Sequence, residues 1–108
     1  MTISYDEWQK MELKIGQIVA AERVEGSDKL LKMQVDLGEE TPRQIIAGIG
    51  KAYEPETLIG RELLFIANLE PRTIMGLESQ GMVLAASDEQ GPIILTPDRP
   101  VAPGAALK

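Results

Sequence analysis

The segment NLEPRTIMGLESQGM, residues 68–82, places an unusual mixture of side chains between two apolar runs. FIANL leads into the segment, and GMVLAA ends it and continues beyond. A simple connection between two strands needs turn residues. It does not need this assortment of hydrogen-bonding groups around an arginine and a flexible methionine. The segment therefore predicts a loop that binds a ligand.

The composition limits the class of protein. The 108 residues have room for one domain, residues 1–108, and for a core that folds without disulfides. The chain has no cysteine, which fits a reducing cytoplasm. It has no histidine, which is the usual general base and the commonest metal ligand. The carboxylates show no catalytic or metal-ligand spacing, so we expect no enzyme, no cofactor and no metal.

The chain also lacks the sequence signals of membrane insertion and secretion. No apolar run approaches the ~20 residues that span a bilayer. No signal-peptide pattern opens the chain. We therefore expect a soluble, cytoplasmic protein with no membrane partner.

The charge is unusual for a protein that binds nucleic acid. Eleven basic and seventeen acidic residues give a net charge of −6, which repels a phosphate backbone at long range. The acidic excess lies outside residues 41–75, where four basic residues balance four acidic ones. A local basic patch in this region would favour a ligand of defined shape over other polyanions.

Alternation of apolar and polar residues predicts an all-β domain with little helix. Expected strands cover residues 13–24, 30–37, 43–50, 61–69, 81–87 and 92–96. Ser4 and Glu7 have the spacing of a capping box, which predicts a short N-terminal helix over residues 5–11. One further helical turn is expected over residues 55–60, between the third and fourth strands.

These elements are typical of a five-stranded Greek-key barrel of the OB type, with its core at about residues 12–96. An SH3-like barrel has a similar number of strands but no natural place for the helical segment at residues 55–60. Gly16 lies inside the first expected strand. It predicts the bend or bulge that curls such a strand around a small barrel.

Two side chains at the start of the 68–82 segment have both a structural and a binding interpretation. Asn68 stands where the chain leaves a strand, so its amide either satisfies loose backbone groups or contacts a ligand. Arg72 carries a planar cation that can hold a phosphate or stack on a base. Exposed arginines are common, so a solvated surface side chain is the alternative for Arg72.

The second half of the segment, GLESQGM, is harder to explain as a simple turn. Gly76 and Gly81 permit a positive φ or a close approach of the backbone. Ser79 is a small donor and acceptor. Met82 can lie against a base or ribose, although a methionine in this position is more often part of a core.

Taken in order, these residues resemble the pattern NLxPxxxxGxxSxGM of the tRNA-binding OB-fold domain family. The family includes domains appended to methionyl- and bacterial phenylalanyl-tRNA synthetases, free-standing tRNA-binding proteins and the CsaA branch. KIGQIVAAERVEGSDKL and RQIIAG are similar to two further elements, so the resemblance covers about residues 12–107. It implies a non-catalytic barrel that grips the outer corner of the L-shaped tRNA.

The resemblance also implies a set of tRNA-contacting residues: Lys29, Arg43, Asn68, Arg72, Ser79 and Met82. By this inference Lys29 and Arg43 hold backbone phosphates, and Met82 packs against an unstacked base. Asn68 and Ser79 form hydrogen bonds to ribose or base edges. For Lys29 the alternative is a solvated residue of a turn.

Two residues depart from the family pattern. Glu70 stands where many relatives have lysine, so a negative charge lies close to Arg72 in the sequence. Ala47 stands where serine is common, so a hydroxyl is absent. We expect lower affinity or an altered tRNA preference from these changes, with the fold retained.

The resemblance further implies a homodimer that acts in trans as a subunit or helper of a methionyl-tRNA synthetase. The segments that flank the barrel would pair, and here they contain Trp8, Met11 and the tail VAPGAALK. An independent chain and a part of a synthetase both fit this sequence.

A CsaA-like chaperone or export-related peptide binder is the alternative function. The acidic net charge and Glu70 favour it, because both discourage RNA and tolerate basic or unfolded clients. The GLESQGM element favours tRNA binding instead, because it matches that branch of the family better.

Overall fold

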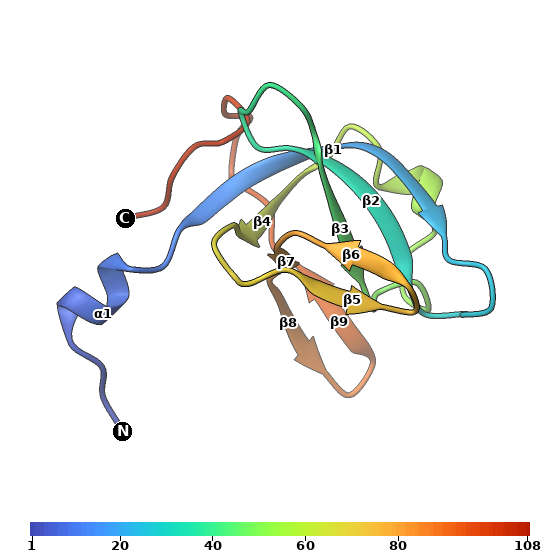
Figure 1. The fold of residues 1–108 in the computed structure, drawn as a ribbon, viewed down its shortest axis with the longest axis horizontal. Helices are drawn as coiled ribbons and strands as arrows, with labels where there is room; N and C mark the ends of the chain where they lie inside the picture. Colours follow the sequence, from blue (N-terminus) through green and yellow to red (C-terminus); the bar gives the residue numbers. More distant parts are fainter.

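The chain forms a curled antiparallel sheet with two hairpins beside it (Figure 1). The structure is a computed structural model and describes residues 1–108. Its elements are α1 (Tyr5–Gln9), β1 (Leu13–Arg23), β2 (Leu31–Asp36), β3 (Arg43–Ala47), η1 (Pro55–Thr57), β4 (Glu62–Ile66), β5 (Arg72–Ile74), β6 (Leu77–Ser79), β7 (Met82–Val83), β8 (Ala85–Asp88) and β9 (Gly91–Ile94). The strand order of the sheet is β3-β2-β1-β4-β7, while β5–β6 and β8–β9 are hairpins.

This architecture confirms the prediction of an all-β barrel of the OB type. β1 pairs with β4 along residues 13–17 and with β2 along residues 17–23, so this long strand belongs to both halves of the barrel. β7 extends the sheet beyond β4, and β3 at the other edge packs against β6 and β7. The 3-10 turn η1 lies between β3 and β4, where an OB barrel has its helical segment.

β1 serves both halves of the barrel because it bends around small residues. A Cβ on Gly16 would lie 2.7 Å from Val35 Cγ1 and 2.8 Å from Leu37 Cδ2, so only glycine fits there without movement. A register shift between Ile18 and Ala20 adds an irregularity to the pairing with β2. Such bulges increase the bend and twist of a strand.

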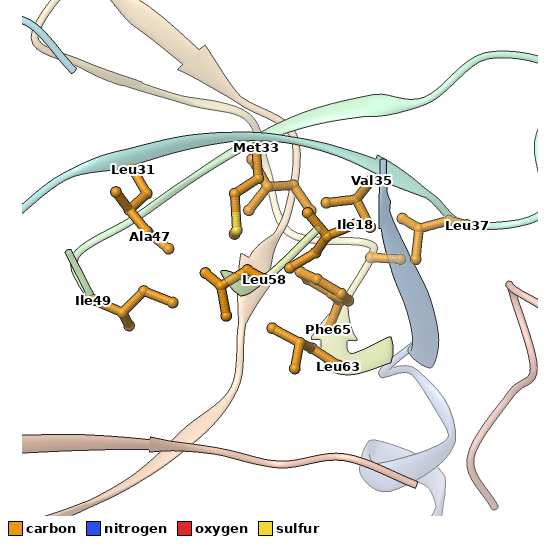
Figure 2. Packing of buried hydrophobic residues seen from close by; sticks show 12 residues of the cluster. Ile18, Leu31, Met33, Val35, Leu37, Ala47, Ile49, Leu58, Leu63 and Phe65 are labelled. Carbon is orange, nitrogen blue, oxygen red and sulfur yellow. The ribbon is translucent and has the colours of Figure 1, made fainter. Parts of the chain in front are cut away.

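The core lies inside the barrel and follows the period of two that a half-buried strand requires (Figure 2). Leu31, Met33 and Val35 of β2 are fully buried, and the residues between them are half-buried. Phe65, the only phenylalanine, fills the centre from β4. Leu58, which directly follows η1, is fully buried in the same cluster and so attaches the 3-10 turn to the barrel.

A smaller apolar cluster positions the β5–β6 hairpin. Val24 and Leu30 flank the β1–β2 loop, and Ile46 joins them from β3. Ile74 and Leu77 of the hairpin pack against these three buried residues. A two-stranded hairpin alone is marginally stable in water. This packing therefore holds the hairpin against the β1–β2 loop.

The N-terminal helix has the predicted capping box and buries none of its residues. Ser4 Oγ accepts a hydrogen bond from the Glu7 backbone N–H at 3.1 Å, and Glu7 Oε1 accepts one from the Ser4 N–H at 3.2 Å. The helix ends at Gln9, two residues before the predicted boundary, and Trp8 is half-buried. Neither α1 nor η1 has the length and apolarity that crossing a bilayer requires.

The C-terminal tail runs without a regular element until its last residues, as predicted. Residues 104–107 then lie along β1, where the Ile15 N–H donates to Ala105 O at 2.9 Å. The Leu107 N–H donates to Leu13 O at 2.9 Å, so the tail continues the sheet beside the first half of β1. Figure 1 shows both ends of the chain on the same side of the molecule.

The structure differs from the expected strands in two places. The expected fifth strand, residues 81–87, is divided into β7 and β8. The division follows Leu84, whose N–H still donates to Leu64 O at 2.9 Å, because the chain then leaves β4 to pair with β9. The 68–82 segment, expected as a loop, contains the β5–β6 hairpin.

We predict that Gly16→Ala destabilises the fold, since the added Cβ would lie within 3.0 Å of three core side chains. Overpacking of this kind lowers the free energy of unfolding by about 1–3 kcal/mol. Urea denaturation measures the change. Gly48→Ala is the matched control, because a Cβ there meets nothing within 4 Å. Equal stability of both variants would show that β1 tolerates a side chain at its bend.

Candidate nucleic-acid interface

Residues 72–79, the middle of the 68–82 segment, form the β5–β6 hairpin, which closes through a two-residue turn at Met75 and Gly76. Their φ angles are 49° and 80°, and positive φ at both positions is the mark of a type I′ turn. Met75 is the only non-glycine residue with a positive φ. The β-branched pair Thr73 and Ile74 before a Met-Gly turn is the sequence signal for this hairpin, and the sequence-based interpretation overlooked it.

Ser79 lies inside the protein, with 2% of its surface exposed. Its Oγ accepts a hydrogen bond from the Ile46 N–H at 3.0 Å and donates one to Gly81 O at 3.0 Å. The hydroxyl therefore takes the place of a missing backbone contact between β3 and the end of β6. The Ser79 hydroxyl therefore uses its donor and its acceptor within the barrel. Direct contact of Ser79 with ribose remains a prediction.

Two neighbours of Ser79 complete the same junction. The Gln80 N–H donates to Gln44 O at 2.8 Å, and Gln44 Nε2 donates to Glu78 O at 2.9 Å. Gly81 has a φ of 134°, and a Cβ there would lie 3.0 Å from Ile66 O. The second half of the motif, GLESQGM, thus joins β3 to β6 and β7 at the seam of the barrel.

Arg43 uses its guanidinium within the protein. Nε and Nη2 donate to the two carboxylate oxygens of Glu39 at 2.8 and 2.7 Å, and Nη1 donates to the carbonyls of Ala67 and Gln80. The hydrogen bond from Arg43 holds the pKa of Glu39 below its usual value, and the same bond raises the pKa of Arg43. Both groups therefore stay charged at neutral pH.

Asn68 fastens the start of β1 to the end of β4. Its Oδ1 accepts a hydrogen bond from the Glu12 N–H at 2.9 Å, and its Nδ2 donates to Lys10 O at 2.6 Å. The amide thereby satisfies backbone groups between α1 and β1, which is the structural interpretation of this residue.

Arg72 and Met82, in contrast, meet at an open hollow. The hollow has a volume of ≈ 380 Å³. It lies between the β5–β6 hairpin and the β7–β8 segment, and the end of β3 contributes Ala47 and Gly48. The Arg72 guanidinium makes no ion pair, and the arginine hydrogen bonds of the protein come from other residues. We call this hollow the Arg72 hollow.

Lys29 lies on a second hollow of ≈ 250 Å³, which we call the Lys29 hollow. The two hollows share Gly48 and Ile49. The backbone carbonyl of Lys29 accepts a hydrogen bond from the Gly50 N–H at 2.7 Å, so the chain is fixed where this lysine leaves the β1–β2 loop. Its side chain is exposed and makes no ion pair.

The structure thus brings together Arg72, Met82 and Lys29 around the end of β3. Arg43, Asn68 and Ser79, the other predicted contacts, make hydrogen bonds that hold the surrounding backbone. The acidic Glu70 is exposed and is absent from the residues that line either hollow. No group of three or more acidic, histidine or cysteine side chains is placed to hold a metal ion.

The comparison with known families agrees with this geometry. The model of the tRNA binding domain family matches residues 13–106. The chain therefore belongs to this family of nucleic-acid-binding domains, and the resemblance seen in the sequence is confirmed.

The relatives among curated proteins are methionine–tRNA ligases. That of Methanocella arvoryzae is 48% identical over 106 residues, which are 98% of this chain and 15% of the ligase. That of Deinococcus radiodurans is 53% identical over 89 residues, which are 82% of this chain and 13% of the ligase. The chain thus spans only a small part, 13–16%, of the length of the curated relatives that it matches.

Solved structures share the whole fold. The MetRS related protein from Pyrococcus horikoshii has a TM-score of 0.92 and 35% identity, and the alignment covers 100% of this chain and 99% of that one. The chaperone CsaA from Bacillus anthracis has a TM-score of 0.90 and 25% identity, with 100% of both chains covered.

We predict that Ser79→Ala lowers the free energy of unfolding by about 1–3 kcal/mol, because the buried Ile46 N–H and Gly81 carbonyl both lose a partner. Ser87→Ala, at an exposed position of β8, is the control and should leave stability unchanged. Chemical denaturation measures both. If Ser79 instead contacts RNA directly, its variant will lose tRNA affinity under conditions in which it remains fully folded.

Proposed function

We propose that this domain binds folded tRNA without catalysis, through the surface that carries Arg72 and Met82. The observation that carries the proposal is an unpaired guanidinium at an apolar hollow on an otherwise acidic protein. Membership of the tRNA binding domain family supports the choice of ligand. Binding at the outer corner of the tRNA is part of the same proposal and predicts indifference to the anticodon.

In this proposal the three residues of the Arg72 and Lys29 hollows have distinct roles. Arg72 holds a phosphate bidentately or stacks on a base, because its five donors have no partner in the protein. Met82 packs against an unstacked base, since a flexible thioether adapts to any base face. Lys29 contributes a second phosphate contact as a point charge.

Arg43, Asn68 and Ser79 act on binding indirectly in this proposal. Arg43 and Ser79 hold the backbone at Ala67 and Gly81, on either side of Arg72 and next to Met82, and Asn68 holds the backbone between α1 and β1. Substitution of any of the three would then lower stability together with affinity. Direct contact with tRNA would instead lower affinity alone.

We further propose that the domain serves a methionyl-tRNA synthetase by raising the local concentration of tRNA near the enzyme. The identity to methionine–tRNA ligases supports this partner. A homodimer is part of the proposal, because exposed apolar side chains gather at the two chain ends, where Met1, Ile3, Tyr5, Met11 and Leu107 are among the exposed large residues. Such an end is suited to a symmetric interface.

A CsaA-like peptide-binding role is the second candidate. The TM-score of 0.90 with CsaA from Bacillus anthracis and the net charge of −6 favour it. The acid-free lining of the Arg72 hollow favours RNA instead. Suppression of client aggregation by a protein that shows no tRNA affinity at low salt would reverse this ranking.

We predict that Arg72→Ala weakens tRNA binding by about 10–100-fold, the loss expected for one charge-assisted contact. It should also reduce the slope of log affinity against log salt by about 1. Titration of labelled, folded tRNA at two salt concentrations measures both values. Arg61→Ala is charge-matched and lies on a different hollow, so it should bind as the wild type does.

Equal affinity of the wild type for tRNA and for an unstructured RNA of similar length would contradict structure-specific binding. Equal binding by the Arg72 and Arg61 variants would place the ligand on another surface.

We predict that sedimentation equilibrium gives twice the 11.8 kDa mass of one chain. Trp8→Asp, which places a charge at the apolar end, should shift the protein toward the monomer. Asp6→Asn on the same helix is the control, because Asp6 is exposed and its change adds no charge to the apolar side chains. A monomer at all concentrations would contradict the dimer.

A further inference from the structure

The Arg72 hollow and the Lys29 hollow adjoin each other, and we call the two together the groove. They share Gly48 and Ile49, which follow β3 and make the floor at the point where the hollows meet. The β8–β9 turn and the start of β9 add the far wall through Gln90, Gly91 and Pro92. Figure 1 shows the β5–β6 and β8–β9 hairpins extending from the same side of the barrel, with the end of β3 near both.

The lining of this groove contains no acidic side chain. Arg72 lines one end, and Lys29 and Lys51 line the other. The absence of acid is notable because the chain has seventeen Asp and Glu residues. The other hollows of comparable size are lined by acids, for example Glu62 and Asp98 in the largest. The groove therefore presents three cations from a lining without carboxylates, and the carboxylate of Asp28 is near it only as the exposed partner of Lys51.

Lys51 is available to a ligand. Its Nζ lies 3.6 Å from Asp28 Oδ2, with side-chain exposures of 70% and 81%. An exposed pair of this length contributes little stability and is screened by salt, so a phosphate can replace the carboxylate. The side-chain amide of Gln90, on the opposite wall, makes no hydrogen bond in the protein and can read a base edge.

The apolar floor of the groove, between Arg72 at one end and the two lysines at the other, suits the bases of an RNA better than its sugar-phosphate backbone. The apolar surface of the Arg72 hollow comes mainly from the half-buried Met82, Val83 and Leu84 and the exposed Ala85, which lie over the buried Ile46, Ala47 and Ile49. Such a surface stabilises an unstacked base face, whereas a base inside a paired helix cannot reach it. Cations at both ends with an apolar middle therefore match a short run of unpaired nucleotides.

We propose that this groove holds at least two consecutive unpaired nucleotides, and that Lys51 and Gln90 bind the second of them. The first base lies in the Arg72 hollow against Met82, and the backbone passes over Gly48 toward Lys29 and Lys51. This inference rests on the proposed function and specifies which feature of an RNA the domain recognises.

A larger side chain at Gly48 would block the point where the two hollows meet, so its substitution tests the proposed path of the RNA. Gly48 is exposed, its backbone lies outside the left-handed region, and a Cβ there meets nothing within 4 Å. Gly48→Leu should therefore fold normally and obstruct the groove where the hollows meet. Thermal unfolding of the variant checks that the fold is retained.

The experiment measures the affinity of the full chain for three labelled probes: folded tRNA, an RNA hairpin with a three-nucleotide bulge, and a fully paired hairpin of equal length. We expect the wild type to prefer the bulged hairpin at least tenfold. Gly48→Leu should abolish this preference, and Lys51→Ala should weaken bulge binding several-fold and lower its salt slope by about 1. Arg61→Ala should match the wild type.

Equal binding of both hairpins by the wild type would overturn the inference, as would wild-type affinity in both groove variants. Failure of the proposed function is a separate result, since it requires that the wild type does not bind folded tRNA. Binding to the bulged hairpin alone would support the groove and reject tRNA as its ligand. Binding to tRNA that survives Gly48→Leu would support the function and reject the groove.

Discussion

The hydroxyl of Ser79 holds the seam on which the rest of the barrel depends. At this seam β3 meets the β6–β7 turn through one backbone hydrogen bond, from Gln80 to Gln44, and otherwise through side chains. An open edge on β3 would leave backbone donors and acceptors without partners. The buried Ser79 hydroxyl, with the side chains of Gln44 and Arg43, therefore closes a sheet that its backbone alone leaves partly open.

Within the 68–82 segment, some residues have a structural role and others are free to contact a ligand. Ser79, Gly81 and Asn68 hold the backbone, and their polar groups are used inside the protein. Arg72 and Met82 project from that frame to a hollow where the protein offers them no polar partner. A side chain whose rotamer is not fixed by the protein can adapt to a ligand, but only if the backbone beneath it is rigid.

The sequence predicted the barrel well because its signals are local and physical. The alternation in β2, the capping box at Ser4 and the bend at Gly16 each determine one element without knowledge of its neighbours. The site was harder to predict, because the residue type does not reveal whether a hydroxyl or guanidinium group faces solvent or bonds to a backbone carbonyl. Arg43 and Arg72 differ in what surrounds them: Arg43 bonds to Glu39, four residues away, and to the distant carbonyls of Ala67 and Gln80, whereas Arg72 has no such partner.

The acid-free groove on an acidic body has a consequence for the kinetics of association. Net negative charge removes the long-range attraction that speeds the encounter of basic proteins with RNA. Attraction begins only when a phosphate has entered the groove, within about one Debye length of ~8 Å at physiological salt. If the groove binds RNA as proposed, the net charge of −6 repels an RNA that leaves the groove rather than recapturing it. Such a surface favours rapid transfer of its ligand over long retention.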